Sequence, residues 1–439
     1  MKQGMHFRNS MASSETFKQR LSDKEQSNLR SWFDLNTVIL FLIPLSQPIE
    51  VTIGGRLLGP DILLCSLFPF LFLIRWHLIR GPLPRTFLYL LSVWFLEAVI
   101  TDLIRETPEA DLIRGWAKIL VFGVDFVSLF MLIAYRMQRL LAYLVGYACG
   151  TLLLIQFNPS ELIQEDPWKF GYAWPVTLFF LFVPVFLPAG LKVFAGAFFA
   201  ALAAILNLIL NFRSMFGVTV LAWLLTGLSE FAHWAKMRRS IVAWAVVFLV
   251  FGYGTVMTYE YLAGSGALGE TVREKYETTA TGDFGLLAGR GEIFASSQAI
   301  MDSPIIGHGS WAHDLVYVIL MERRLESAGY EIGDSGNEDL IPSHSYIFGA
   351  WVEAGIAGAV FWAWVLYVVG RALYLNLSKP GPLATIFSFL FIGFIWDIVF
   401  SPFGLDARFF APARLIAAML IITQAGGIAG PPRLSRRAS

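Results

Sequence analysis

A histidine and two glycines carry the first chemical signal in this sequence. In the stretch HSYIFGAWVEAGIAG, nine residues separate His344 and Ser345 from Gly355, and Gly358 completes a Gly-x-x-Gly pair. An imidazole titrates near neutral pH, so His344 is a candidate to accept a proton from a reacting group. If one helix runs through the stretch, both glycines lie within about 40° of His344 around its axis. They would then form a smooth groove below it, or serve only for close helix packing.

A second group of residues could bind a metal ion. His308, His313 and Asp314 lie close in sequence, and His344 could fold near them. His308 stands between two glycines, however, and is better explained as a turn residue, while Asp314 suits the first turn of a helix. We therefore expect neither a metal nor another cofactor.

The composition indicates a membrane protein. Hydrophobic residues make up 56% of the 439 positions and charged residues 15%, against about 45–50% and about 25% in ordinary soluble proteins. Basic and acidic residues are equal at 33 each, so no net charge favours nucleic-acid binding. Cys65 and Cys149 both lie in apolar runs, which indicates neither a disulfide framework nor a thiolate metal site.

Twelve apolar runs are candidates to cross the membrane as helices, which need about 20 mainly apolar residues. They are residues 35–52, 58–79, 87–104, 115–135, 138–156, 171–188, 191–210, 215–232, 241–262, 344–370, 381–400 and 407–425. With the N-terminus inside, the short cytoplasmic segments hold the excess of Lys and Arg. We therefore expect an all-α integral membrane protein of about 12 transmembrane helices.

The expected spans divide the chain into five parts. These are a cytoplasmic tail at 1–34, spans one to nine at 35–262, an extracytoplasmic loop at 263–343, spans ten to twelve at 344–425, and a cytoplasmic tail at 426–439. Within the loop, helices are predicted over Arg290–Asp302 and Trp311–Ser327, with Gly307 and Gly309 forming the turn between them. Two short helices over a bundle would form a small cap.

Several carboxylates lie inside expected spans, where an unpaired charge is costly, and three of them are Glu353, Asp125 and Asp397. Glu353 falls about 180° from His344 on the expected helix, so we expect it to pair with a neighbouring helix. Asp125 and Asp397 lie in apolar runs, and the sequence assigns a partner to neither of them.

The order of three motifs resembles one family of bacterial enzymes. The His-Ser, nine-residue, Gly-x-x-Gly frame at 344–358 looks like the signature of O-antigen ligases and their polysaccharide polymerase relatives. GRGEIFASSQAIMDSPIIGHG at 289–309 resembles the same family's arginine, helix, proline and Gly-x-Gly turn. Asn-Phe-Arg-Ser at 211–214 resembles its other outward-facing arginine. After the loop arginine, Phe294 replaces the aromatic residue that the family usually has there, which is a mild departure from the family's pattern.

The resemblance implies a glycosyltransferase of the bacterial inner membrane, active at its periplasmic face. The donor would be a glycan on undecaprenyl diphosphate, with lipid A core or a second lipid-linked glycan as the acceptor. Arg213 and Arg290 would bind the diphosphate, because a guanidinium fork engages two phosphate oxygens at once. His344 would act as base, giving inversion without a metal. Further substrate contacts would involve Ser345, Gly355, Gly358, Arg114 and Lys118.

Structural alternatives exist for each of these cations. Arg213 could contact lipid headgroups, Arg290 could form a salt bridge to Glu292 or Asp302, and Arg114 and Lys118 could form a solvated face one turn long.

Ligase and polymerase remain alternatives, and a transporter or lipid flippase is a third from another class. The outer loop at 157–169 is short and acidic, whereas polymerases of this kind often have two sizeable basic outer loops, which favours the ligase. Against a transporter, the sequence shows no internal repeat and no pair of Gly- or Pro-broken helices in matching halves.

Overall fold

A computed structural model describes residues 34–52, 55–234, 291–327, 339–379 and 381–426, with scattered positions between 246 and 273. This part of the chain is all-α apart from one antiparallel hairpin of β1 (Glu50–Thr52) and β2 (Arg56–Leu58). The first helices are α2 (Leu35–Leu45), α3 (Gly59–Arg75), η1 (Trp76–Arg80), α4 (Pro82–Arg105), α5 (Glu109–Ile133), α6 (Met137–Phe157), α7 (Glu161–Glu165) and η2 (Trp168–Tyr172). They are followed by α8 (Ala173–Phe182), η3 (Val183–Phe186), α9 (Ala189–Ile209), α10 (Arg213–Trp234), α13 (Gly291–Asp302), α14 (Leu315–Ser327), α15 (Tyr346–Ala354), α16 (Ile356–Ser378), α17 (Ala384–Phe400) and α18 (Ala407–Ala425).

The protein is a multi-pass membrane protein by helix length and hydropathy. Among the described residues, eight helical stretches are long and apolar enough to cross: Gly59–Arg80, Pro82–Arg105, Glu109–Ile133, Met137–Phe157, Trp168–Phe186, Arg213–Ala232, Ile356–Ser378 and Ala407–Ala425. The twelve expected spans are not all confirmed. With 11 residues, α2 is only about 16 Å long, and most of 241–262 lies outside the described residues.

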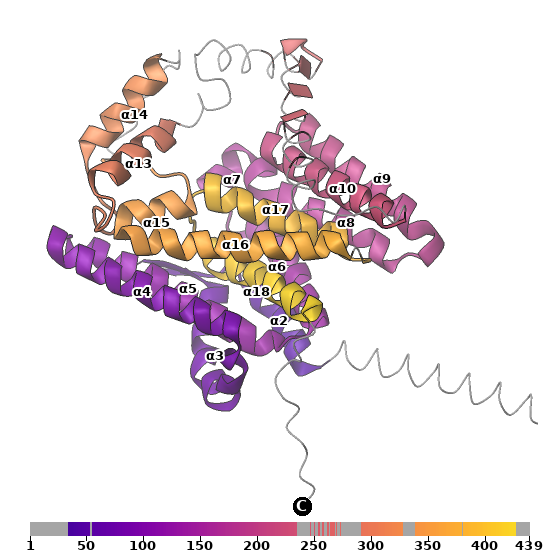
Figure 1. The fold of residues 1–439 in the computed structure, drawn as a ribbon, viewed down its shortest axis with the longest axis horizontal. Coiled ribbons are helices and arrows are strands. Elements are labelled where there is room, and N and C mark those ends of the chain that lie inside the picture. Colours follow the sequence, from indigo (N-terminus) through magenta and orange to yellow (C-terminus); the bar gives the residue numbers. More distant parts are fainter. Residues whose placement is uncertain are drawn as a thin grey trace, which may run out of the picture.

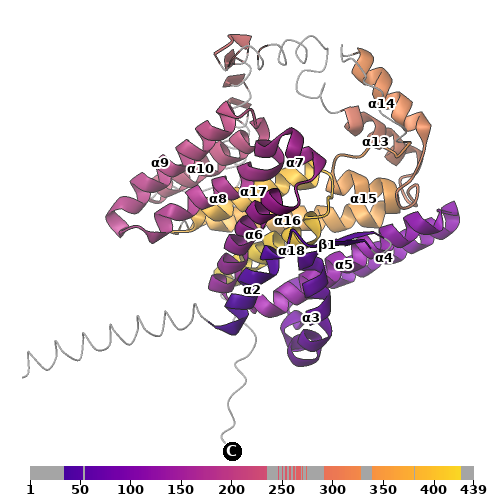
Figure 2. The same ribbon diagram turned by 180° about the vertical axis from the view of Figure 1, so that it is seen from behind.

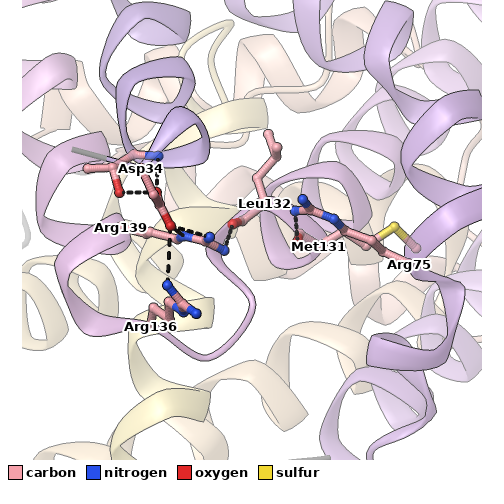
Figure 3. Close-up of polar contacts among 7 residues, drawn as sticks. Asp34, Arg75, Met131, Leu132, Arg136 and Arg139 are labelled. Carbon is pink, nitrogen blue, oxygen red and sulfur yellow. Dashed lines mark hydrogen bonds and ion pairs between the residues drawn. The ribbon is translucent and has the colours of Figure 1, made fainter. Parts of the chain in front are cut away.

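The helix ends gather at two ends of the bundle. At one end, which we call the Asp34 end, Arg139 Nη2 lies 2.5 Å from the Asp34 carboxylate and Arg136 Nη1 lies 3.2 Å from it. Figure 3 shows Arg75 beside them, donating to the Met131 carbonyl at 3.1 Å. Because Arg139 donates to Leu132 as well, arginines satisfy two of the carbonyls that the last turn of α5 leaves free.

The opposite end, which we call the Ser345 end, is held by a chain segment that folds onto the bundle. Arg105, at the end of α4, donates to the Gly307 carbonyl at 2.9 Å. Asp102 accepts from the Ser310 amide at 2.6 Å and from the Trp116 indole at 2.7 Å. Figure 1 shows α13 and α14 above α15 at this side of the molecule, while α9 and α10 lie beyond α17. Figure 2 shows the same separation from behind.

A core of aromatic rings joins α4, α5 and α16. Phe87 stacks on Phe126 with ring centroids 3.7 Å apart, and Phe361 packs edge-on against Phe87. The most enclosed helix is α18, where the Arg414 guanidinium lies between the rings of Phe394 and Phe410, 4.3 Å and 4.4 Å from their centroids. A cation enclosed in this way needs a counter-charge.

Two buried ion pairs tie α18 to its neighbours. Arg414 Nη1 lies 2.5 Å from Asp397. Asp397 therefore has a partner, which the sequence did not identify. Arg408 lies 2.7 Å from Asp61 at the start of α3. Asp125 is fully buried, and its oxygens accept no hydrogen bond from the described residues.

The tenth expected span is broken at Gly355. A single helix over 344–370 was predicted, but α15 ends at Ala354, and Gly355 has φ +94° and ψ −158°, a region essentially restricted to glycine. A Cβ on Gly358 would lie 2.5 Å from the Ala350 carbonyl, although one straight helix would separate these residues by about 12 Å along its axis. Helix α15 therefore folds back across the start of α16.

The break is stabilised by side chains and loops from elsewhere in the chain. Glu97 of α4 accepts from the Ala357 amide at the start of α16. The amides of His308 and Gly309 donate to Val352 and Glu353, carbonyls in the last turn of α15, at 2.7 Å and 3.0 Å. The orphan groups of both helix ends are thus satisfied within the bundle.

The cap helices agree with the sequence at one helix and differ at the other. Helix α13 ends at Asp302 as predicted, and Gly307 and Gly309 turn with φ +71° and +100°. Helix α14 begins at Leu315 instead of Trp311, which itself has φ +52°. Tyr317 and Val318 are buried, with Tyr317 packed against α13, whereas Leu315 is exposed.

Candidate functional site

A cavity of about 140 Å³ lies at the Ser345 end, where α15 folds back. Its walls come from α4, α5, α15, α16, the turn before α14 and the segment between α17 and α18. The lining residues are Trp94, Lys118, Trp311, Ser343, Ser345, Tyr346, Gly349, Ala350, Glu353, Trp362, Pro402 and Phe403. A mostly apolar wall with a few convergent polar groups is typical of a small-molecule site.

The N-terminus of α15 faces this cavity. Ser345 is its N-cap: the hydroxyl accepts from the Phe348 amide at 3.2 Å and donates to the Ile398 carbonyl at 2.9 Å. The cap residue therefore fixes the start of α15 against the end of α17. Helix N-termini carry a partial positive charge, which favours an anionic group beside them.

His344 lies directly before this cap, between two serines that line the cavity. It is outside any helix, which corrects the expectation that it shares a helix face with the paired glycines. Its side chain is 52% exposed, and Nδ1 lies 3.7 Å from the Glu292 carboxylate in the first turn of α13. An exposed imidazole at the rim of a cavity can exchange a proton with a bound group.

The start of α13 therefore meets the His-Ser motif, although the two are separated by about 50 residues in sequence. Arg290, the predicted phosphate ligand, directly precedes α13 but lies outside the described residues. Phe294, the departure from the family pattern, leaves the helix intact, and Arg324 of α14 lies 5.6 Å from its ring.

An ion pair between Lys118 of α5 and Glu353 of α15 closes one wall. Both side chains are largely buried, at 18% and 22% exposure. The prediction that Glu353 pairs with a neighbouring helix is confirmed. Lys118 also lies 5.9 Å from the ring of Trp311. The pair is neutral overall, so the positive charge of Lys118 is compensated within the wall.

Arg213 lies at the same end of the bundle but is not in the cavity wall. Thr226 and Ser388 are hydrogen-bonded at 3.2 Å, and a Cβ on Gly393 would lie 3.7 Å from Val218. Helices α10 and α17 are therefore antiparallel. Five residues before Val218, Arg213 reaches the level of the last turn of α17, next to which Ser345 is bonded.

Three other residues predicted to contact substrate, Arg114, Gly355 and Gly358, do not line the cavity. Arg114 is half exposed, pairs with Asp111 at 3.4 Å and does not line the cavity. Gly355 and Gly358 lie at the break between α15 and α16, where their lack of a side chain permits close backbone packing. They form no groove below His344, because the continuous helix that would place them there does not exist.

The histidines of the proposed metal alternative are engaged separately. His308 Nε2 lies 2.7 Å from the Ala299 carbonyl, and His313 Nδ1 lies 2.6 Å from Asp339. The hydrogen bond with His313 holds the pKa of Asp339 below its ordinary value. Among the described residues, no three His, Cys, Asp or Glu side chains converge as a metal site.

The aromatic residues of the cavity were missed by the sequence reasoning. Tyr346, Trp362 and Phe403 form a triangle of ring contacts, with centroids 5.0 to 5.6 Å apart. They come from three separate segments, so no local spacing indicates that they meet. Trp311 had a local signal, because only Ser310 separates it from the Gly-x-Gly turn.

Comparisons with protein-family models, with curated proteins and with solved structures find no match to this chain.

Proposed function

We propose that this protein is a membrane glycosyltransferase of the O-antigen ligase and polysaccharide polymerase kind. The observation that carries the proposal is the contact of His344 with the first turn of α13, next to the Ser345-end cavity that the flanking Ser343 and Ser345 line. Two segments that resemble motifs of the same family, about 50 residues apart in sequence, are neighbours in space.

In the proposed reaction, the donor is a glycan carried on undecaprenyl diphosphate. The acceptor hydroxyl attacks the anomeric carbon from the face opposite the diphosphate, and His344 takes the hydroxyl proton. The carbon–oxygen bond to the diphosphate breaks, and the leaving diphosphate keeps the electron pair. The configuration at the anomeric carbon is inverted, and the scheme needs no metal.

Arg213 and Arg290 are proposed to stabilise the diphosphate as its charge develops. The level of Arg213 beside the end of α17 supports this role, since it places the residue at the same end as Ser345. The N-terminus of α15 adds positive potential at the cavity. Lys118, neutralised by Glu353, is proposed to shape the wall that receives the sugar.

The membrane arrangement follows from the same proposal. The Asp34 end would face the cytoplasm and the Ser345 end the periplasm of a bacterial inner membrane, as the arginines at the Asp34 end favour. The full set of twelve spans would add α2, α9, α17 and 241–262 to the eight candidates.

The acceptor is proposed to be lipid A core, with a second lipid-linked repeat as the polymerase alternative. Competition between these acceptors in liposomes, with one lipid-linked polysaccharide as donor, decides between them. Exclusive growth of the lipid-linked chain would make the protein a polymerase.

The central test is single-turnover transfer by the full chain in liposomes. His344→Gln should reduce the rate by roughly 10²- to 10⁴-fold, the usual effect of a general base, while donor binding stays nearly unchanged. His313→Gln is the matched control, since it changes another cap histidine, whose partners are Asp339 and Asp111 and not the first turn of α13. A His344→Gln enzyme with near-normal transfer and normal donor affinity would remove the catalytic assignment.

The helix break at Gly355 supports a second candidate function, that of a transporter or lipid flippase. Discontinuous helices often form substrate sites in transporters, and the sequence had suggested no such helix pair. The same liposomes test this candidate: movement of the lipid-linked donor across the bilayer without any acceptor would support transport.

A further inference from the structure

A second cavity, of about 400 Å³, lies near the Asp34 end, in the connection between α3 and α4. It is lined by Trp76, Ile79, Arg80, Arg85 and Leu88. It is separate from the Ser345-end cavity, and none of the residues considered above lines it. Two guanidiniums thus share one concave site with an indole and two aliphatic side chains.

The two arginines of this cavity have no acidic partner among the described residues. The Arg80 guanidinium stacks on the Trp76 ring, 3.6 Å from its centroid, and Arg85 is exposed. Stacking holds the guanidinium flat and leaves its N–H groups directed outward at the ring edge. At the nearby Asp34 cluster, by contrast, one carboxylate serves both Arg136 and Arg139.

The surroundings of the cavity are strongly apolar. On α3, Phe70, Leu73 and Ile74 are 66%, 78% and 72% exposed, and Tyr89 of α4 is 68% exposed. In a multi-pass membrane protein, such faces contact lipid chains. The arginine pair and Trp76 therefore lie where the apolar face ends, at headgroup level.

We propose that this cavity binds the headgroup of an anionic phospholipid. The lipid phosphate would lie between Arg80 and Arg85, whose forked donors match its oxygens. Its glycerol and upper chains would contact Ile79 and Leu88 and continue along the exposed apolar face of α3. Trp76 would hold Arg80 in place and cover the ester region.

The apolar wall distinguishes a lipid from the other anions that two arginines could attract. A soluble phosphate gains nothing from Ile79, Leu88 and the exposed side chains of α3. A lipid satisfies the charged and apolar parts of the site together. The inference requires only a membrane-embedded chain and is independent of the proposed transfer reaction.

The test is a titration of dioctanoyl phosphatidylglycerol against the full chain in neutral detergent, read by native mass spectrometry. Wild-type protein should bind phosphatidylglycerol well above phosphatidylcholine of the same chain length. Arg80→Gln with Arg85→Gln should weaken binding by roughly 10- to 30-fold, as expected for two basic residues at a lipid surface. Trp76→Ala should weaken it less, because both charges remain.

The matched control is Arg371→Gln with Lys379→Gln, which removes two exposed positive charges at the end of α16. It should leave binding within about twofold of wild type. Equal losses in both double variants would show general surface charge and overturn the site. Displacement of the lipid by an equal concentration of inorganic phosphate would overturn the lipid assignment. Thermal unfolding of every variant verifies that folding is unchanged.

Discussion

The two ends of the bundle treat charge in opposite ways. At the Ser345 end, the described acids and bases near the cavity are paired or bonded to backbone: Lys118 with Glu353, and Arg105 with the Gly307 carbonyl. Among the described residues near the Asp34 end, arginines exceed acids, and a single carboxylate, that of Asp34, faces both Arg136 and Arg139. Irregular backbone is dense at the first end and sparse at the second.

The difference follows from what the backbone requires in each place. At the Ser345 end, the broken helix and the docked loop leave many amides and carbonyls without helical partners, and an unpaired one is costly at membrane depth. Asp102, Glu97 and Thr101 supply those partners. At the Asp34 end, Arg75 and Arg139 satisfy two carbonyls in the last turn of α5, while Arg80, Arg85 and Arg136 are exposed.

The largest expected effect comes from removing the helix break. Gly355→Ala places a Cβ against the Ile305 carbonyl and forces a residue into φ/ψ space that costs roughly 1–3 kcal/mol by itself. We expect a loss of about 3 kcal/mol or more in unfolding free energy and loss of transfer. The measurement is thermal unfolding in detergent, with transfer in liposomes.

Gly370→Ala is the matched control for this prediction. Gly370 lies in α16 with open space around its Cα, so alanine should stabilise the helix by roughly 0.5–1 kcal/mol. Equal melting temperatures for both variants would mean that the break does not depend on Gly355.

Local signals in the sequence were sufficient for most helices. The turn near Tyr135 and the break near Pro188 separate helices as expected, with Ala134 and Tyr135 both at positive φ. The end of α13 at Asp302 follows from Pro304, since the residues before a proline disfavour helix. In each case the cause lies within a few residues of its effect.

Distant causes explain what the sequence did not predict. Gly355 breaks its helix because partners far away in sequence bind both new ends. Ile305 and Glu97 accept hydrogen bonds from the first amides of α16, and the amides of His308 and Gly309 donate to the last carbonyls of α15. Helical periodicity runs through the break without interruption, so the predicted groove of Gly355 and Gly358 below His344 was wrong. The pairing of Lys118 with Glu353 was foreseeable only in part: the need for a partner was evident, but not its identity.

An intermediate effect is expected at the Lys118–Glu353 pair. Lys118→Met leaves a largely buried carboxylate unpaired and should cost about 2 kcal/mol, somewhat below the range for fully buried pairs. Adding Glu353→Leu removes that carboxylate and should restore most of the melting temperature. If the pair only shapes the wall, transfer should recover with it. Stable folding without transfer would give the pair a direct role with substrate.

Arg56→Met is the control for this cycle. Its pair with Glu50 in the β-hairpin is exposed, with Arg56 at 54%, so its loss should cost less than about 1 kcal/mol. A larger effect than that of Lys118→Met would contradict the assigned difference in burial.

The smallest effect is expected at the Asp34 end and depends on pH. Burial opposes the charged form of Asp34, but hydrogen bonds from Arg139 and Thr37 outweigh it and hold the pKa of Asp34 well below its ordinary value of 3.8. Its stabilising contribution is therefore fully present above pH 3.8 and is lost as the pH falls toward the lowered value. Asp34→Asn should lower the unfolding free energy by about 1 kcal/mol at pH 7, and the difference from wild type should shrink below about pH 4.

Melting temperatures at pH 7, 5 and 3.5 measure this difference. The control is Glu161→Gln, which changes an exposed acid on α7. A constant difference at all three pH values would mean that the arginines at this end do not depend on the Asp34 charge.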